Sequence, residues 1–313
     1  MPLRGLPFRP KQSTFFMQTK NDIQFLLESA GIRPNKRLGQ HFLIDLNLLA
    51  KLVEAADVAK DDVVLEVGCG TGALTQALAE RCGKVIAVEI DPALAQIASQ
   101  QLEEKSNVQI LNTDILENKH NLSGAVIKAI ESARKENKGR FLLVANLPYN
   151  AASGVMINLI TEPLDSAMSV DAMYVTVQKE VAERMTAKPG TRNYGTLSIF
   201  LNVTGEVKLL RILKPSVFWP QPRVNSAMIS FVRDRNKIRR ISNMEIFSRL
   251  VGLFMQHRRK MLKAIVKFAA GDFTEIDWEN LFGQCGIDSR KRPENLSPNE
   301  FLCLANLTCN YIK

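Results

Sequence analysis

The sequence lacks any apolar run close to the roughly 20 residues that a membrane-spanning helix requires. Its basic N-terminal segment, residues 1–18, also lacks the apolar stretch of a secretory signal. Because this segment contains no acidic residue, a transit peptide is compatible with it, but we expect a flexible extension to which no role can be assigned. The hydrophobic share of 46% in 313 residues allows one large core and a smaller one.

Patterns for metal binding, disulfide bonding and nucleophilic catalysis are missing as well. The five cysteines, at 69, 82, 285, 303 and 309, form no Cys-x-x-Cys pair, and there is no Ser-His-Asp set. We therefore expect no metal site and no disulfide, with Cys285, Cys303 and Cys309 as small core residues. Free thiols are typical of a reducing compartment, so we predict a cytoplasmic protein.

Positive charge is concentrated in two segments of a chain whose formal net charge is +9. Residues 233–263 hold ten Lys and Arg against Asp234 and Glu245, and residues 1–40 hold seven against Asp22 and Glu28. A solvated helix face does not explain such an excess of basic residues, because like charges on one surface repel each other. The excess predicts a polyanionic partner, and nucleic acid fits better than a membrane because no strongly amphipathic anchor accompanies the charge.

Strands and helices alternate from residue 63 onward, which predicts an α/β fold with a mostly parallel sheet covered on both faces. Helices are expected at 46–57, at 72–81 and from about 92. The seven expected strands are 63–67, 84–89, 108–111, 141–145, 173–177, 196–203 and 226–232.

The pattern becomes helical from about residue 243, where Ile246, Leu250, Leu253 and Phe254 follow a helical period. Ser297-Pro298 predicts the start of a last helix. We therefore expect a catalytic domain over 19–240 and a small all-α domain over 241–313, which carries part of the positive charge.

The turn Glu66-Val67-Gly68-Cys69-Gly70-Thr71-Gly72 follows the first predicted strand, and its glycines let the backbone approach a ligand. Gly68-x-Gly70-x-x-Ala73 also fits the dinucleotide fingerprint, so a nicotinamide oxidoreductase stays an alternative. An acidic residue two positions before Gly68 is typical of S-adenosylmethionine sites instead.

Glu89 ends the second strand and can accept from ribose hydroxyls. Asp114, at the end of the third strand, can accept from an adenine amino group or cap a helix, and Ile90 and Ile115 can sandwich the ring or pack in the core.

Asn146-Leu147-Pro148-Tyr149 follows the fourth predicted strand. The Asn146 side-chain oxygen and the Pro148 carbonyl can accept hydrogen bonds from an exocyclic amino group, and Tyr149 can stack on a base. Phe218, in an aromatic and proline-rich segment, is a second candidate to stack the base, or part of a rigid loop. These residues indicate an enzyme that acts on the amino nitrogen of a nucleobase. Arg258, Arg259 and Lys260 form the densest basic group and are candidates for phosphate contacts.

Six segments together resemble the bacterial small-subunit ribosomal RNA adenine N6,N6-dimethyltransferase family, over about residues 33–307. The segments are Gly39–Leu43, the glycine turn, Asn146–Asn150, Gln178–Arg184, Gln256–Lys260, and Gly286-Ile287-Asp288 with Leu296-Ser297. The turn reads Gly-Cys-Gly where the family usually has Gly-Pro-Gly.

The resemblance implies a Rossmann-like class I methyltransferase that uses S-adenosylmethionine. It implies cofactor binding by His41, Leu43, Gly68, Glu89, Asp114 and Asn146, and we expect Gly70 of the glycine turn to take part as well. The implied reaction is dimethylation of two adjacent adenosines near the 3′ end of 16S ribosomal RNA during subunit assembly, and we expect a monomer. Two further alternatives are a non-catalytic RNA-binding assembly factor, and an adenine methyltransferase acting on DNA or large-subunit RNA.

Overall fold

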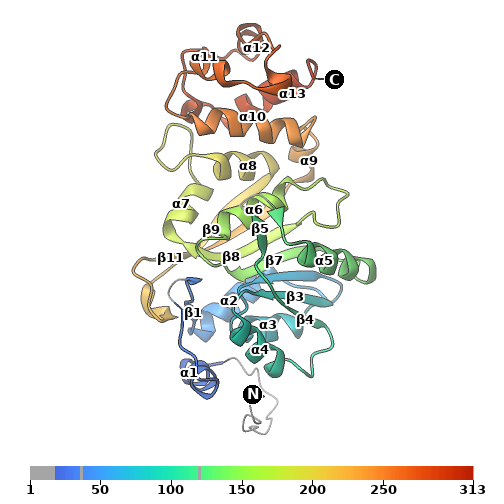
Figure 1. Cartoon of the computed structure of the whole chain (residues 1–313), viewed down its shortest axis with the longest axis vertical. Helices are drawn as coiled ribbons and strands as arrows, with labels where there is room; N and C mark the ends of the chain where they lie inside the picture. Colours follow the sequence, from blue (N-terminus) through green and yellow to red (C-terminus); the bar gives the residue numbers. More distant parts are fainter. Residues whose placement is uncertain (1–17, 36–37, 119–120, 313) are drawn as a thin grey trace. The chain divides into compact units, whose positions relative to one another are not determined.

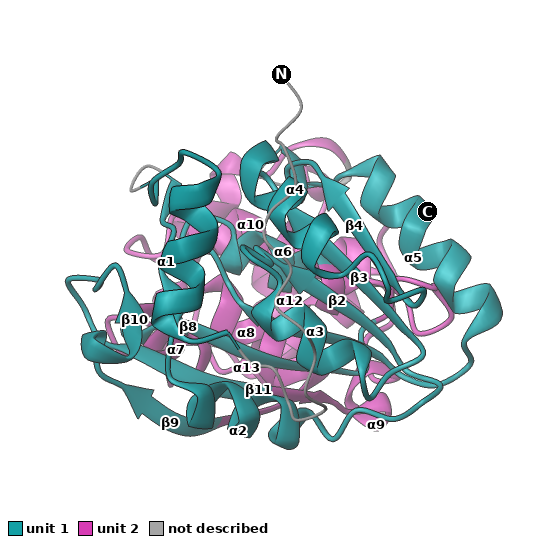
Figure 2. Cartoon of the chain, turned by 90° about the horizontal axis from the view of Figure 1, so that it is seen from below, with its two compact units in different colours: residues 1–158, 170–179, 209–230 teal, residues 159–169, 180–208, 231–313 magenta. Residues whose placement is uncertain are grey.

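The computed structural model describes residues 18–35, 38–118 and 121–312. It divides into two compact units (Figure 2). Unit 1 comprises residues 1–158, 170–179 and 209–230, and unit 2 comprises residues 159–169, 180–208 and 231–313. Most of the extension expected over residues 1–18 lies outside the described residues, as do Lys36 and Arg37. The boundary expected at 240 stays a prediction.

A seven-stranded sheet forms the centre of the fold, with strand order β4-β3-β2-β7-β8-β11-β9 (Figure 1). The pairs β4–β3, β3–β2, β2–β7 and β7–β8 are parallel, as the alternating pattern predicts. The strands are β2 (Val63–Val67), β3 (Lys84–Glu89), β4 (Val108–Asn112), β7 (Phe141–Asn146), β8 (Ala172–Gln178), β9 (Gly205–Leu213) and β11 (Ser226–Arg233). Two short pairs lie outside it: β1 (Phe42–Leu43) with β10 (Phe218–Trp219), and β5 (Leu116–Asn118) with β6 (Asn121–Leu122).

The central strands are buried on both sides, because separate sets of helices pack on them. α2 (Leu46–Ala56) and α3 (Ala73–Ala79) share one apolar cluster with Val64, Val85 and Leu142 of the sheet. α5 (Gly124–Glu136) packs on β2 and β3 with residues that lie outside this cluster. Every residue of β2 is buried. The other helices that the described residues form before residue 162 are α1 (Lys20–Ser29), α4 (Pro92–Gln101) and α6 (Ala152–Thr161).

The strand predicted at 196–203 is wrong, because this segment forms the helix α8 (Thr196–Thr204). Seven of its nine residues are buried, so the amphipathic period that would reveal a helix is absent from the sequence. The seventh strand is β9 instead, which follows directly at Gly205.

Unit 2 has a core of aromatic side chains on helices. Phe254 of α10 (Met244–Gln256) contacts Trp278 and Phe282 of α12 (Trp278–Gln284) and Phe301 of α13 (Pro298–Thr308). The unit also contains α7 (Lys179–Met185) from Glu180 onward, α9 (Arg235–Ile238), α11 (Leu262–Ile265) and the 3-10 turn η3 (Val266–Phe268). None of the helices in the described residues has the length and apolar character needed to cross a membrane.

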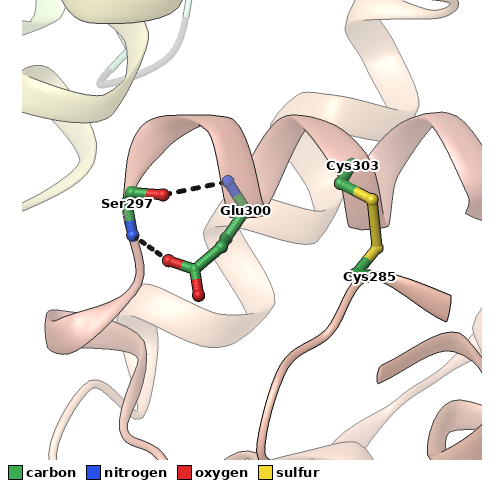
Figure 3. The surroundings of a disulfide bond; sticks show 4 residues. All are labelled: Cys285, Ser297, Glu300 and Cys303. Atoms are coloured by element: carbon green, nitrogen blue, oxygen red, sulfur yellow. Dashed lines mark hydrogen bonds between the residues drawn. A yellow bond between two sulfur atoms is a disulfide. The ribbon is translucent and has the colours of Figure 1, made fainter. Parts of the chain in front are cut away.

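A disulfide joins Cys285, at the end of α12, to Cys303 of α13, so the expectation that all cysteines are free is wrong (Figure 3). The two residues are 18 positions apart, and packing brings their Cα atoms to 6.0 Å. A capping box between Ser297 and Glu300 fixes the start of α13 at Pro298. The start of the helix in turn determines the position of Cys303 within it. Cys69, Cys82 and Cys309 are free.

Thiol titration checks the disulfide. Protein purified without reductant and then denatured should show three reactive thiols, and five after reduction. Cys303→Ser should show four under both conditions and lower the free energy of unfolding by about 3 kcal/mol, from the loop that the bond closes. Five thiols before reduction would contradict the bond.

Candidate active site

The glycine turn between β2 and α3 is fastened to the end of β3. The φ angles of Gly68, Gly70 and Gly72 are +78°, +58° and +87°, which favour glycine. The Gly68 amide donates to the Val88 carbonyl at 2.8 Å, and the Gly70 amide donates to Oε2 of Glu89 at 2.8 Å. The turn therefore presents its backbone at the carboxyl ends of two neighbouring strands, where ligands of open α/β sheets bind.

Two other segments lie so close to the turn that a side chain would be in tight contact at Gly68 and would collide at Gly70. A Cβ atom on Gly68 would lie 3.1 Å from Cγ of Pro148, and one on Gly70 would lie 2.9 Å from Cε1 of Phe42. The glycines are thus needed for packing as well as for backbone conformation. Pro148 packs directly against the turn, so the two motifs singled out in the sequence are in contact.

A cavity in unit 1 collects nearly every side chain predicted to bind the cofactor or the base. It lies among the glycine turn, the ends of β3 and β7, and the segment that contains β1. Its lining includes His41, Leu43, Gly68, Gly70, Glu89, Ile90, Asp114, Ile115, Asn146, Leu147, Pro148 and Tyr149. Across the described residues, no group of three or more His, Cys, Asp or Glu could hold a metal ion.

The Asn146 amide is oriented by one hydrogen bond. Its Nδ2 donates to the main-chain carbonyl of His41 at 2.8 Å, and His41 is itself held by a 2.6 Å bond from Nδ1 to the Pro220 carbonyl. Within the part of the chain that the structure describes, Oδ1 of Asn146 has no donor. Because the nitrogen is occupied, the oxygen is the end of the side chain left to accept a hydrogen bond from a ligand.

The acceptor role predicted for the Pro148 carbonyl is wrong. That oxygen accepts from the amides of Ala151 (3.2 Å) and Ala152 (3.1 Å) at the start of α6, which uses both of its lone pairs. Leu147 offers the alternative, since its amide donates to Thr176 but no amide in the described residues donates to its carbonyl. Leu147 also lines the cavity.

Tyr149 lies at the same place with its ring partly exposed. The ring centroid is 5.5 Å from that of His41, with a tilt of 32°. Its hydroxyl is 3.5 Å from Oγ of Ser226, at the limit of hydrogen bonding. Burial raises the pKa of the phenol, so the tyrosine is neutral at physiological pH and offers an uncharged ring.

The carboxylates at the strand ends differ in burial. Glu89 is buried and accepts from the amides of Gly70 and Asp91, and burial raises its pKa. Asp114 is exposed, with Oδ1 accepting from the Leu116 amide at the entry to β5. Because a strand follows, Asp114 is not a helix N-cap. Ile90 is 44% exposed within the cavity lining, whereas Ile115 is buried.

Glu66 is the acidic residue before the glycine turn that is typical of S-adenosylmethionine sites, and the structure indicates what its side chain can do there. Its carboxyl is fully enclosed at the cavity, and burial raises its pKa to about 8. The atom Oε2 is buried without a hydrogen-bond partner in the described residues. An unsatisfied buried oxygen costs about 1–3 kcal/mol, so a cationic or N–H group of a ligand would stabilise it.

Gln18 and Thr71 form a further contact that no sequence pattern revealed. Nε2 of Gln18 donates to the Thr71 carbonyl at 3.0 Å, and the Thr71 hydroxyl donates back to Oε1 at 2.5 Å. Both side chains are buried. Thr71 belongs to the glycine turn, so the residue that precedes α1 supports the cavity wall 53 positions away.

The stacking role predicted for Phe218 is wrong in this fold. Phe218 is 1% exposed, pairs with Leu43 across the β1–β10 ladder, and packs in the apolar cluster under α2. A ring enclosed on all sides offers no face to a base. Side chains alternate in direction along a strand, and in β10 the Phe218 side chain points inward. The aromatic and proline-rich sequence of this segment does not reveal that direction.

The basic group in unit 2 also divides. The Arg258 guanidinium binds Glu294 (3.2 Å) and the carbonyls of Tyr194 (2.9 Å) and Arg192 (3.0 Å). These bonds give it partners inside unit 2, so we no longer expect the phosphate contact predicted for it. Its hydrogen bonds join the end of α10 to the loop before α8. Arg259 and Lys260 are exposed, as a phosphate contact requires, and their predicted role stays open.

Known proteins resemble the chain over most of its length. The family model described as "Ribosomal RNA adenine dimethylase" matches residues 31–309. A relative named Ribosomal RNA small subunit methyltransferase A, from Shouchella clausii, is 36% identical over 90% of this chain and 92% of its own. The protein of that name from Caldanaerobacter subterraneus is 37% identical over 90% of this chain and 100% of its own.

Solved structures share the fold. A dimethyladenosine transferase from Plasmodium falciparum has a TM-score of 0.63 and 24% identity, covering 85% of this chain and 96% of its own. The 23S rRNA methyltransferase ErmE has a TM-score of 0.56 and 22% identity, covering 85% and 98%. The family match and the identity of the relatives place this chain in the ribosomal RNA adenine dimethylase family, as a methyltransferase that uses S-adenosylmethionine.

Proposed function

We propose that the protein dimethylates the N6 amino groups of two adjacent adenosines near the 3′ end of 16S ribosomal RNA during assembly of the small subunit. The observation that carries this proposal is the pair of open acceptors, Asn146 Oδ1 and the Leu147 carbonyl, in one cavity with the Tyr149 ring. The relatives' name, which refers to the small subunit, supports that choice of RNA.

The cavity suits S-adenosylmethionine in its polar groups. The unpartnered Oε2 of Glu66 would receive the ammonium of the amino-acid part, beside backbone that only glycine leaves open. Glu89 would accept from the ribose hydroxyls, and Asp114 from the adenine amino group between Ile90 and Ile115. When bound, the cofactor supplies an electrophilic methyl group on a sulfonium.

On the substrate side, the residues of the Asn146 motif hold the amino nitrogen in place. The adenine amino lone pair is delocalised into the ring, which makes the nitrogen a poor nucleophile. Two hydrogen bonds, from its N–H groups to Asn146 Oδ1 and the Leu147 carbonyl, favour a more tetrahedral nitrogen and aim its lone pair. Tyr149 stacks on the ring. Positioning of this kind contributes roughly 7–11 kcal/mol in favourable cases, and no general base is required because the product's proton can pass to water.

The RNA must deliver an adenosine that has left its stack, at a cost of a few kcal/mol. Contacts of exposed cations such as Arg259 and Lys260 with phosphates would offset that cost. In this proposal residues 241–313 form an RNA-binding domain, and the protein acts as a monomer in the cytoplasm, where small subunits assemble.

Replacement of Asn146 tests the proposed base contact. Asn146→Ala should lower kcat by at least about a hundredfold, as loss of a preorganised transition-state contact does, with cofactor affinity within about tenfold. Asn146→Asp, which keeps an acceptor oxygen, should retain more activity than the alanine variant. The measurement is labelled methyl transfer to under-methylated small subunits. Wild-type turnover by Asn146→Ala would remove the assigned role, and an inactive wild-type protein that still bound RNA would favour an assembly factor.

The basic group can be divided by salt dependence. Replacing both Arg259 and Lys260 by Gln should reduce the slope of log K against log salt by up to about 1.5, because two phosphate contacts are lost. Arg258→Gln should instead lower the melting temperature and leave the slope unchanged. Lys51→Gln, at an exposed site on α2, serves as the control for a lost charge. A slope that fell with Arg258 alone would contradict the internal role of that side chain.

Gln18 offers a test of the cavity wall. Gln18→Ala removes both bonds to Thr71 and should weaken S-adenosylmethionine binding about tenfold, since each bond contributes about 1 kcal/mol to the position of the turn. The value of kcat at saturating cofactor should stay near wild type. Isothermal titration gives the affinity, with Gln24→Ala on α1 as the control. An unchanged dissociation constant would show that the contact serves the fold alone.

A further inference from the structure

A short surface of unit 2, here called the 257–268 surface, combines exposed cations with exposed apolar groups. The stretch from His257 to Gly271 contains five Lys and Arg and no acidic residue. Leu262 and Ile265 are buried and fix α11 to the core. The exposed cations around them are Arg259, Lys260, Lys263 and Lys267.

Phe268 lies at the end of this surface and is 48% exposed. Its ring stacks on His257, with centroids 4.4 Å apart and planes inclined by 26°. The Lys260 ammonium is 4.8 Å from the centroid of the same ring. An aromatic pair of this kind, rimmed by cations, has the two components of a single-strand binding site, namely a surface for stacking and charge for the backbone.

Single exposed apolar side chains are common and need no function. We therefore compare Phe268 with two other phenylalanines to see whether its surroundings differ. Phe25 on α1 is equally exposed, at 51%, but has no cation or ring contact among the described residues. Phe273 has a cation over its ring, Arg249 at 4.8 Å, but it is buried. Phe268 combines exposure, a stacked partner and a cation.

We propose that the stacked pair His257–Phe268 is a platform for an unpaired base of ribosomal RNA, distinct from the adenosine that is methylated. Lys260 has a flexible side chain, and it can leave the ring to bind the adjacent phosphate. Arg259, Lys263 and Lys267 bind neighbouring phosphates. The inference rests on the proposed function for its choice of ribosomal RNA. RNA fits better than a protein partner because the stretch from His257 to Phe268 carries four exposed cations and no acidic residue beside an exposed aromatic ring.

The test compares Phe268→Ala, Phe268→Leu and Phe268→Trp with Phe25→Ala as matched control. The probes are a single-stranded RNA oligonucleotide, a naked fragment of 16S RNA and under-methylated small subunits. Phe268→Ala and Phe268→Leu should bind all three about 5- to 100-fold more weakly, the range for a lost base stack, and Phe268→Trp should bind like wild type. Phe25→Ala should show no change.

Salt dependence separates stacking from charge. Phe268→Ala should keep the wild-type salt slope, because no phosphate contact is lost, whereas Lys260→Gln should reduce it. Wild-type affinity of Phe268→Ala for naked RNA would overturn the proposal, and a loss confined to intact subunits would assign the surface to a ribosomal protein instead.

Methyl transfer at saturating subunits keeps this inference apart from the proposed function. Phe268→Ala should reach wild-type kcat with a raised KM. A normal KM with active enzyme would overturn the platform and leave the methyltransferase assignment intact, whereas an inactive wild-type protein would count against the assignment itself.

Discussion

The hydrogen bond from Asn146 to the His41 carbonyl is the constraint on which the site depends. A carboxamide has a donor and an acceptor end of nearly equal size, and only the acceptor can hold an amino group. The bond occupies the nitrogen and leaves the oxygen open. His41 can do this because its ring is fixed to the Pro220 carbonyl, so the segment around β1 decides the chemistry at the end of β7.

Much of the fold could be predicted from sequence, because buried parallel strands and the turns after them leave local signals. The alternating pattern predicted β2 and β7 with their neighbours, and Ser297-Pro298 predicted the start of α13. The helix α8 could not be recognised, since a helix buried on nearly all sides loses its polar face. The disulfide depends on how α12 and α13 pack, and no spacing of cysteines encodes that.

The sequence indicated which residues line the candidate site better than it indicated what each of them does. Backbone geometry decided against the Pro148 carbonyl, which the start of α6 occupies, and the pairing of β10 decided against Phe218. Arg258 looked like its neighbours, but only a folded chain shows which of several cations has internal partners. The dinucleotide fingerprint was ambiguous by itself, and family membership removed the nicotinamide alternative.

The contact between Gly68 and Pro148 couples the cofactor turn to the Asn146 motif. A side chain at position 68 would press on the proline ring, which directly follows the acceptors on Asn146 and Leu147. A substitution at Gly68 would therefore affect the Asn146 motif as well as the cofactor turn.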